Sequence, residues 1–422
     1  MDWTNIRNII AFWLLGLCNN YGYVIMLSAA EDILSAQNGN GSTSSNSSDT
    51  CEKTLDSRHC SAISTGAVLL ADNMPALLVQ LTFPFFMHRF PFGFRALLVF
   101  CLQVSCYFVV AFSKNVAMSL IGVCLASFGQ GIGEITFLAM AAHYKAETIA
   151  SWSSGTGGAG LIGSFSYALI TQAGLSPSNT LLVQLFIPFV FAIAYFVILT
   201  FPSTVYTPSL NPKTWIIPHN YDQTVFDEAK LRGEVLNNEK VPQRELSAAD
   251  RLRLILPLLH LMIPLASVYT AEYIINQGLT ELVIFNCAQG LNLPLSSQYR
   301  WYQVLYQLGV FLSRSSVKIY EMPVWLIWLL PLLQLTNMVF FFFEAVYWFT
   351  PTIIIIFCLI VFEGLLGGSA YVNTYNKIHK LVEPDVREYS LSVASMGNSI
   401  GTNFAAFVSI PLYNWVCGMK IP

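Results

Sequence analysis

Long apolar stretches recur along almost the whole chain and are separated by short polar segments. A helix of about 20 residues crosses the roughly 30 Å of hydrocarbon in a bilayer, and many of these stretches have that length. Because backbone N–H and C=O groups cannot stay unpaired in lipid, each stretch is predicted to be helical. The stretches are continuously apolar, without the alternation of a barrel strand. Charged residues make up only 11% of the chain, against about 25% in a soluble domain.

We therefore predict an all-α polytopic membrane protein with about 11 spans in a 6+5 arrangement. The polar segment 202–250 is the one long interruption after the first loop. It divides the chain into an N-terminal six-helix bundle (1–201), a cytosolic linker (202–250) and a C-terminal five-helix bundle (251–422). The predicted spans are 8–34, 61–86, 94–113, 117–142, 150–173, 179–201, 252–277, 297–315, 323–345, 351–378 and 388–416.

The basic residues orient the chain. With the N-terminus in the cytosol, 16 of the 21 Lys and Arg residues fall on the cytosolic side, as the positive-inside rule requires. The Ser-, Asn- and Gly-rich loop 35–60 is then lumenal, and it contains N-glycosylation sequons at Asn40 and Asn46, although serine-rich loops also produce sequons by chance. We expect Cys51 and Cys60 in this loop to form a disulfide with each other. The other cysteines are expected to be small core hydrophobes.

A faint repeat connects the two halves. The fourth span contains SFGQGIGEITFLAMAAHYK and the tenth contains VFEGLLGGSAYVNTYNKIHK, each with one glutamate among small residues (Glu134 and Glu363). Parallel six-helix repeats are the plan of major facilitator transporters, which bind their substrates at the midplane between the halves. The alternative is that glycine-rich helices resemble one another without a repeat.

Four acidic residues lie deep in the predicted spans. Ionisable groups in a membrane are costly and usually face a cavity or a partner. Each acid is therefore a candidate for proton coupling or gating, or else a hydrogen-bonded carboxyl that only joins helices. The four are Asp72, Glu134, Glu272 and Glu363.

The eighth span is unusually polar and aromatic, and Arg300 opens it from the lumenal side. Tyr299, Gln303 and Tyr306 share one face of this helix. One cation with amide and hydroxyl groups suits an anionic, hydroxyl-rich solute. The alternative is an interfacial aromatic belt with a snorkelling arginine. Three asparagines in other spans are further candidates to contact the substrate: Asn19, Asn20 and Asn276.

Motifs for catalysis and for metal binding are missing from the sequence. There is no CxxC or His/Cys cluster, no HExxH and no GxSxG. The Gly-rich stretch 153–164 lacks the Lys-Ser/Thr of a phosphate-binding loop, so it favours close helix packing. We therefore expect no enzyme activity, no cofactor, no metal and no nucleic-acid partner.

Several stretches resemble the battenins, a family of lysosomal and endosomal membrane proteins linked to Batten disease. They cover nearly the whole chain in order. They are FWLLGLCNNYGYVIMLSAAEDIL (12–34), AVLLAD (67–72), SWSSGTGGAGLIG (151–163), ITQAGLSP (170–177), AEYIINQGL (271–279), QYRWYQVLYQLGVFLSRSS (298–316) and EGLLGGSAYVNTY (363–375).

This resemblance implies a major-facilitator-like fold with eleven spans, residence in late endosomes and lysosomes, and export of glycerophosphodiesters, the deacylated remains of phospholipids. Two departures from the family stand out. The chain ends in CGMKIP, which is not a C-a-a-X prenylation box, and the linker lacks a clean acidic-dileucine sorting signal. Two other functions remain open: transport of another lysosomal solute such as basic amino acids, and a membrane scaffold that binds lysosomal proteins through 202–250.

Overall fold

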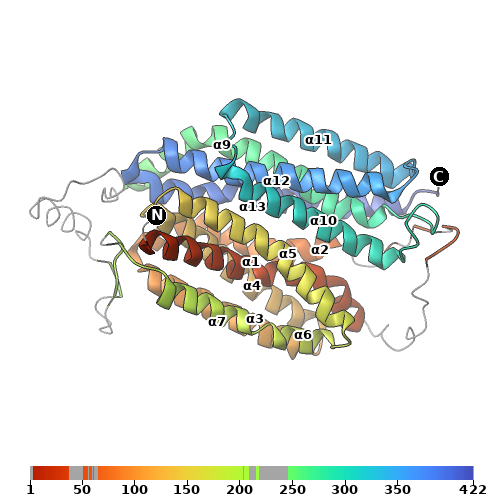
Figure 1. The fold of residues 1–422 in the computed structure, drawn as a ribbon, viewed down its shortest axis with the longest axis horizontal. Helices are drawn as coiled ribbons and strands as arrows, with labels where there is room; N and C mark the ends of the chain where they lie inside the picture. The colour runs from red at the N-terminus through yellow and green to blue at the C-terminus, as the bar shows by residue number, and fades with distance from the viewer. Residues whose placement is uncertain are drawn as a thin grey trace, which may run out of the picture.

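A computed structural model describes residues 3–37, 51–55, 57–58, 60, 65–202, 204–208, 215–217 and 246–421. Its long helices run side by side along the longest axis, with the two chain termini at opposite ends of the bundle (Figure 1). The helices before residue 202 occupy one side of this bundle, and those after residue 246 occupy the other. The sequons at Asn40 and Asn46 and most of the predicted linker lie outside the described residues.

The helices of the first half follow the predicted spans closely. The last predicted span, 179–201, is interrupted between α6 and α7. Pro188 has no N–H to donate to the carbonyl of Gln184, and its ring crowds that carbonyl, so a continuous helix is disfavoured here. The elements are α1 (Trp3–Gln37), α2 (Thr65–Thr82), α3 (Phe92–Ala111), α4 (Val116–Ala141), α5 (Glu147–Gln172), α6 (Pro177–Val183), α7 (Phe186–Ile193) and the π-helical η4 (Ala194–Ile198).

The second half begins with a capped helix. The Ser247 hydroxyl accepts a hydrogen bond from the backbone N–H of Asp250 (3.2 Å), which satisfies one of the free donors at the start of α9. Trp348, with φ of 46°, adopts the left-handed conformation that ends α11. The elements are α9 (Ala248–Ile274), the π-helical η6 (Ile275–Leu279), η7 (Thr280–Leu282), α10 (Leu295–Ser315), α11 (Val324–Tyr347), α12 (Ile353–Leu381) and α13 (Arg387–Cys417).

Six helical segments among the described residues are long and apolar enough to cross a membrane by length and composition alone. They are Phe92–Ala111, Ala117–Ala141, Pro177–Ile198, Ala249–Leu282, Val324–Tyr347 and Ile353–Leu381. The more polar long helices α1, α2, α5, α10 and α13 run alongside them (Figure 1). Among these, α5 packs against α10 and α2 packs against α13, so they join the two sides of the bundle. A helix covered by other helices can carry polar groups that lipid would exclude.

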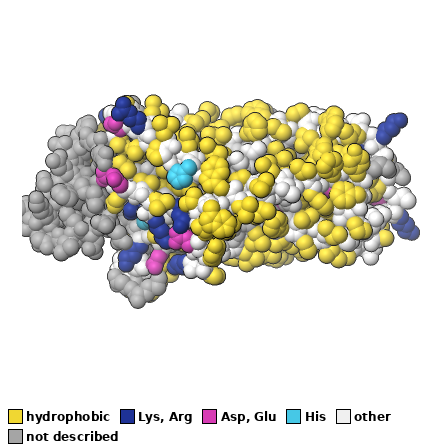
Figure 2. All heavy atoms as spheres, turned by 90° about the horizontal axis from the view of Figure 1, so that it is seen from above, with side chains coloured by type: hydrophobic (Ala, Val, Ile, Leu, Met, Phe, Trp, Pro, Cys, Tyr) yellow, Lys and Arg dark blue, Asp and Glu magenta, His cyan; other side chains and the backbone are white. Residues whose placement is uncertain are grey.

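The outer surface agrees with a position in lipid. Figure 2 shows hydrophobic side chains over the middle of the bundle, with charged side chains gathered at the ends and mostly at the end where the N-terminus lies. Large apolar side chains such as Phe165, Trp325 and Phe404 are more than half exposed. Water would penalise that exposure, whereas a bilayer core accommodates it.

The loop after α1 is bonded to the second half of the chain. Disulfides join Cys51 to Cys287 and Cys60 to Cys417, with Cα–Cα distances of 5.2 and 6.2 Å. The predicted Cys51–Cys60 bond is therefore wrong, as is the interpretation of Cys287 and Cys417 as core thiols. All four cysteines lie at the end of the bundle opposite the N-terminus, because α13 ends there.

Arg58, which lies between Cys51 and Cys60 in the sequence, gives the physical reason for this pairing. The Arg58 guanidinium is 6% exposed and donates to the carbonyl oxygens of Ala345 (2.6 Å) and Val346 (2.8 Å) in the last turn of α11. It also stacks on the Trp348 ring, 5.1 Å from the ring centroid. A cation at a helix C-terminus is favourable. These contacts lay the loop across the second half, so each cysteine meets a different segment there.

Candidate functional site

Arg314, in the last turn of α10, connects three other helices. Its Nη1 donates to the Thr156 hydroxyl of α5 (2.6 Å), and its Nη2 donates to the Tyr269 hydroxyl of α9 (2.9 Å). Its guanidinium carbon lies 4.2 Å from the centroid of the Tyr371 ring on α12, a cation–π contact. Helical side chains lean toward the helix N-terminus, so the guanidinium lies deeper in the bundle than the Arg314 Cα.

The charge of Arg314 has no ion-pair partner within the part of the chain that the structure describes. Its two hydroxyl partners are neutral, and its buried Nε makes no hydrogen bond to a described residue. A guanidinium carries five N–H donors. Arg314 therefore keeps donors and a positive charge available for an anion, which can accept two parallel hydrogen bonds from it.

Glu134 on α4 is joined to the opposite half through Tyr371. The Tyr371 hydroxyl donates to Glu134 Oε1 and accepts a hydrogen bond from Trp152 Nε1 of α5 (3.3 Å). Glu134 is 2% exposed, and Trp152 is fully buried. The Arg314 cation is near enough to interact electrostatically with Glu134. The predicted acid Glu134 and the missed cation Arg314 thus share one tyrosine ring between the two halves.

A second set of acids lies within the second half. The Tyr306 hydroxyl of α10 donates to Glu272 Oε1 of α9. Asn276 Nδ2 donates to Glu363 Oε1 of α12 at 2.8 Å. Both glutamates are buried. Four of the residues predicted for substrate contact or coupling are thereby brought together, although no contact here tests their roles.

Asp72 lies apart from both sets, on α2. It is 1% exposed, and neither carboxylate oxygen has a hydrogen-bond partner among the described residues. The Tyr23 and Tyr273 hydroxyls, 2.9 Å apart, connect α1 to α9 within electrostatic range of this acid. Asp72 is therefore a buried acid near a contact between the halves.

Of the remaining predicted residues, Asn20 also forms a hydrogen bond with the Glu134 side chain, whereas those near the start of α10 lie elsewhere. Asn19 donates to the backbone oxygen of Gln130 (3.1 Å), and Asn20 accepts from the Gln130 side chain (3.3 Å), so both asparagines join α1 to α4 within the first half. Arg300 is exposed near the start of α10. Tyr299 and Gln303 are half-buried. A binding role for these residues stays a prediction.

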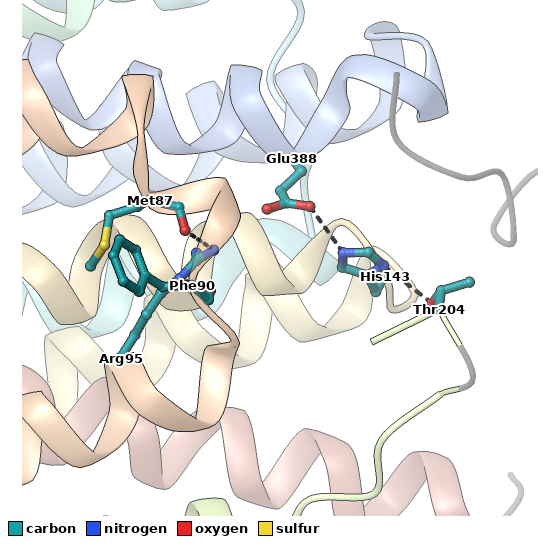
Figure 3. A network of polar contacts seen from close by, with 6 residues as sticks. All are labelled: Met87, Phe90, Arg95, His143, Thr204 and Glu388. Carbon is teal, nitrogen blue, oxygen red and sulfur yellow. Dashed lines mark hydrogen bonds and ion pairs between the residues drawn. The ribbon is translucent and has the colours of Figure 1, made fainter. Parts of the chain in front are cut away.

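At the end of the bundle that holds the N-terminus, the halves meet through a contact between a histidine and a glutamate. His143 Nε2, after α4, lies 3.2 Å from Glu388 Oε2 of α13, and His143 Nδ1 lies 3.2 Å from the Thr204 hydroxyl oxygen. Figure 3 shows these contacts beside Arg95, whose guanidinium donates to the carbonyl oxygens of Met87 and Phe90 in the turn before α3. This end of the bundle is therefore held together across the two halves.

The comparisons with known proteins agree along the whole chain. A family model described as CLN3 protein matches residues 10–419. The chain is 40% identical to battenin of Canis lupus familiaris, over 98% of this chain and 92% of that protein. It is 35% identical to protein btn-1 of Neurospora crassa, over 98% and 89% of the two chains. The chain belongs to the CLN3 (battenin) family.

The fold of this family member matches a solved transporter structure. The human organic anion transporter MFSD10 (TETRAN) superposes with a TM-score of 0.62, covering 98% of this chain and 96% of that one at 12% identity. At that identity the match shows that the fold is shared, and it carries no information about the substrate. The prediction of an all-α, major-facilitator-like membrane protein is confirmed.

Arg314 is not among the site residues that the sequence of this battenin relative predicts. The positive-inside rule counts Arg314 among the 16 cytosolic basic residues, and the cation that the sequence predicts for the site is Arg300. One signal was available in the sequence: spans seven and ten carry tyrosines, among them Tyr269 and Tyr371, that suit an arginine partner. Only the fold shows that these rings surround Arg314.

Proposed function

We propose that this CLN3-family chain is a membrane transporter that binds a solute through an anionic group between its halves and moves it by alternating access. The observation that carries the proposal is Arg314, whose direct contacts among the described residues are two hydroxyls and an aromatic ring, with Glu134 and Glu272 in electrostatic range but not in an ion pair with it. A half-buried cation with free donors is costly unless a ligand uses it. Its contacts to α5, α9 and α12 let a bound anion influence both halves.

The proposed substrate class is the glycerophosphodiesters. A phosphodiester carries one negative charge and two oxygens that match the guanidinium edge. The hydroxyls of Thr156, Tyr269 and Tyr371 can exchange hydrogen bonds with glycerol hydroxyls. The battenin resemblance implies the same substrate class, which makes export of phospholipid breakdown products the most specific form of this proposal.

The proposed location is the lysosomal and late endosomal membrane, with the N-terminus in the cytosol. Disulfides persist in oxidising compartments, and both bonds lie at the end of the bundle away from the N-terminus. The basic residues favour the opposite end for the cytosol. The His143–Glu388 contact would then close the cytosolic side, which supports a state that opens toward the lumen.

One observation favours a second candidate, a transporter for a cationic solute such as a basic amino acid. Asp72 is buried close to the contact between Tyr23 and Tyr273, and neither of its carboxylate oxygens has a hydrogen-bond partner in the described part of the chain. A cationic group could satisfy those oxygens. In that case Arg314 would serve to organise tyrosines, and Asp72 would bind the cargo.

Uptake by proteoliposomes tests both candidates. The full-length protein is reconstituted, and uptake of labelled glycerophosphocholine is compared with uptake of labelled lysine. Hydrogen bonds to a charged group contribute about 1.5–3 kcal/mol, so Arg314→Gln is expected to reduce glycerophosphocholine uptake roughly 10- to 100-fold.

Arg300→Ala is the matched control, because it removes an arginine from the same helix at an exposed position. We expect its uptake to stay close to the wild-type rate. Loss of uptake in Arg300→Ala alone would instead support the role that the sequence assigned to Arg300. Lysine uptake that depends on Asp72, without glycerophosphocholine uptake, would replace the first candidate with the second.

A further inference from the structure

Two glutamates face each other across the contact between α9 and α12. Asn276, one turn beyond Glu272 on α9 and η6, donates to Glu363 at 2.8 Å. Gly367, one turn beyond Glu363 on α12, lies so close to Glu272 that an added Cβ would be 2.0 Å from Glu272 Oε2. The two helices are antiparallel, so the Glu272–Gly367 contact and the Asn276–Glu363 contact lie one helical turn apart.

This contact holds more hydrogen-bond acceptors than donors. Tyr306 supplies one donor to Glu272, and the Asn276 amide supplies one to Glu363 and one to the Glu272 backbone oxygen (3.2 Å). Among the described residues, three acceptors remain without a partner: Glu272 Oε2, Glu363 Oε2 and Asn276 Oδ1. Their side chains are buried, with exposures of 1%, 0% and 2%. Buried acceptors of this kind are normally satisfied.

The orientation of the Asn276 amide makes its unpartnered oxygen informative. Both groups that it contacts, Glu363 Oε1 and the Glu272 carbonyl, accept hydrogen bonds, so the NH2 end must face them. The oxygen end is then left for a donor that the described protein does not supply. An asparagine oxygen and two carboxylate oxygens without donors indicate a missing positive ligand.

Among the described residues, the one neighbouring positive charge is that of Arg314, and it forms no ion pair with either glutamate. The ionisable side chains that face the pair are Tyr269 and Tyr273 of α9 and Tyr306 and Arg314 of α10. The tyrosines are neutral donors. Arg314 interacts with Glu272 only through space, because its own hydrogen bonds go to hydroxyls. One cation that forms no ion pair with them cannot keep two carboxylates ionised when they are buried together.

We propose that Glu272 and Glu363 together bind one proton and form a coupling site in the second half, apart from the anion site at Arg314. This proposal rests on the proposed transport function and names the coupling ion. When the pair binds a proton, one carboxylate charge near Arg314 is neutralised, so Arg314 attracts an anion more strongly. Proton and anion therefore strengthen each other's binding. That coupling is reciprocal. The transporter therefore carries the phosphodiester solute and a proton in the same direction, out of an acidic compartment.

Infrared spectroscopy tests proton binding without any need for transport. A protonated carboxyl has a C=O stretch separate from that of a carboxylate, and the full-length purified protein is titrated through neutral and acidic pH. We expect a protonated-carboxyl band that is lost in Glu272→Gln and also in Glu363→Gln. Glu344→Gln is the matched control, because Glu344 is a buried acid of α11 whose Oε2 is held by Thr350.

Three outcomes would overturn the proposal. The band could persist unchanged in both pair variants, or it could disappear only in Glu344→Gln. It could also disappear on adding sodium at constant pH, which would show that the pair binds sodium. Glu363→Asp keeps a carboxyl at the position, so we expect it to retain the band. This variant keeps the test valid if a Gln variant does not fold.

Proteoliposomes then separate this proposal from the transport proposal. We expect an inward glycerophosphocholine gradient to acidify the vesicle interior in the wild type, as read by an enclosed pH dye. In Glu272→Gln, exchange of labelled for unlabelled solute should continue while acidification falls at least tenfold. Solute uptake without acidification in the wild type would reject the proton site alone, and no uptake at all would reject the transport function.

Discussion

The Tyr371 hydroxyl on α12 donates a hydrogen bond to the Glu134 carboxylate on α4, so a tyrosine of the second half is attached to a buried acid of the first. The same ring lies under the Arg314 guanidinium. An anion that binds Arg314 therefore acts on a side chain that holds the two halves together. This relationship gives a physical route from substrate binding to the opening of the bundle.

Removing the Tyr371 hydroxyl should weaken the closed state. Hydrogen bonds to charged groups are worth about 1.5–3 kcal/mol, so Tyr371→Phe is expected to shift the closed-to-open ratio at least about tenfold toward open. Spin labels at Lys145 and Lys318, after replacement of the exposed free Cys101 and Cys358, would report this as a longer distance between the halves.

Tyr375→Phe is the control for that experiment. Tyr375 lies one turn away on α12, but its hydroxyl donates to Asn398 of α13 within the same half (3.1 Å). Its distance distribution should match the wild type. Equal shifts in the Tyr371 and Tyr375 variants would show that the Glu134 contact does not hold the halves closed.

The disulfide connectivity can be checked directly by peptide mapping without reduction. We expect fragments that link Cys51 to Cys287 and Cys60 to Cys417. Loss of a disulfide commonly costs about 2–4 kcal/mol, so Cys60→Ser should lower the unfolding temperature, whereas Cys358→Ser should leave it unchanged. Recovery of a Cys51–Cys60 peptide would contradict the structure.

The α10–α12 contact should not tolerate a methyl group. An added Cβ at Gly364 would lie 2.3 Å from the Tyr306 backbone oxygen, and one at Gly309 would lie 2.4 Å from the Val361 backbone oxygen. Gly364→Ala is therefore expected to destabilise the protein by about 1–3 kcal/mol. Thermal unfolding in detergent measures this. Gly93→Ala, whose nearest neighbour would be 3.8 Å away, should be nearly neutral.

One surface ion-pair network should make stability depend on pH. Lys377 and Lys380 donate to the Glu321 carboxylate (2.7 and 2.5 Å) and hold the pKa of Glu321 below its usual value. Because the folded pKa is lowered, this stabilisation is present above the unfolded pKa of about 4.5 and is lost as pH falls through the folded pKa. Such pairs contribute roughly 1 kcal/mol or less.

Thermal unfolding at two pH values measures that effect. Glu321→Gln should lower the unfolding temperature slightly near neutral pH, and the difference from the wild type should vanish well below pH 4.5. In a variant in which Lys377 and Lys380 are both glutamine, the Glu321 substitution should have no further effect. An equal loss in the presence and absence of the two lysines would rule out the ion pairs as its cause.

The helical fold was predictable because its cause is local. In lipid, the backbone N–H and C=O groups of a continuous apolar stretch can find hydrogen-bond partners within the stretch only if it is helical. That rule applied to nearly every span. Interruptions were harder to predict. The break after α6 depends on how Pro188 and Gln184 fit their surroundings, and neither residue alone excludes a helix.

The disulfides and the central cation were not predictable for a different reason. Cys51 and Cys60 are close in sequence, but the contacts of Arg58 with α11 decide where the loop lies. Similarly, a cation one residue from a helix end suggests the membrane surface. The direction in which Arg314 leans, and the tyrosines that meet it from other helices, are properties of the assembled bundle.

The most direct test of the account is a structure of the purified full-length protein with glycerophosphocholine bound. We predict density for the phosphate next to the Arg314 guanidinium, between α5, α9, α10 and α12, with the glycerol hydroxyls near Thr156 or Tyr269. Phosphate density beside Arg300, or a ligand that binds away from the contact between the halves, would contradict the account.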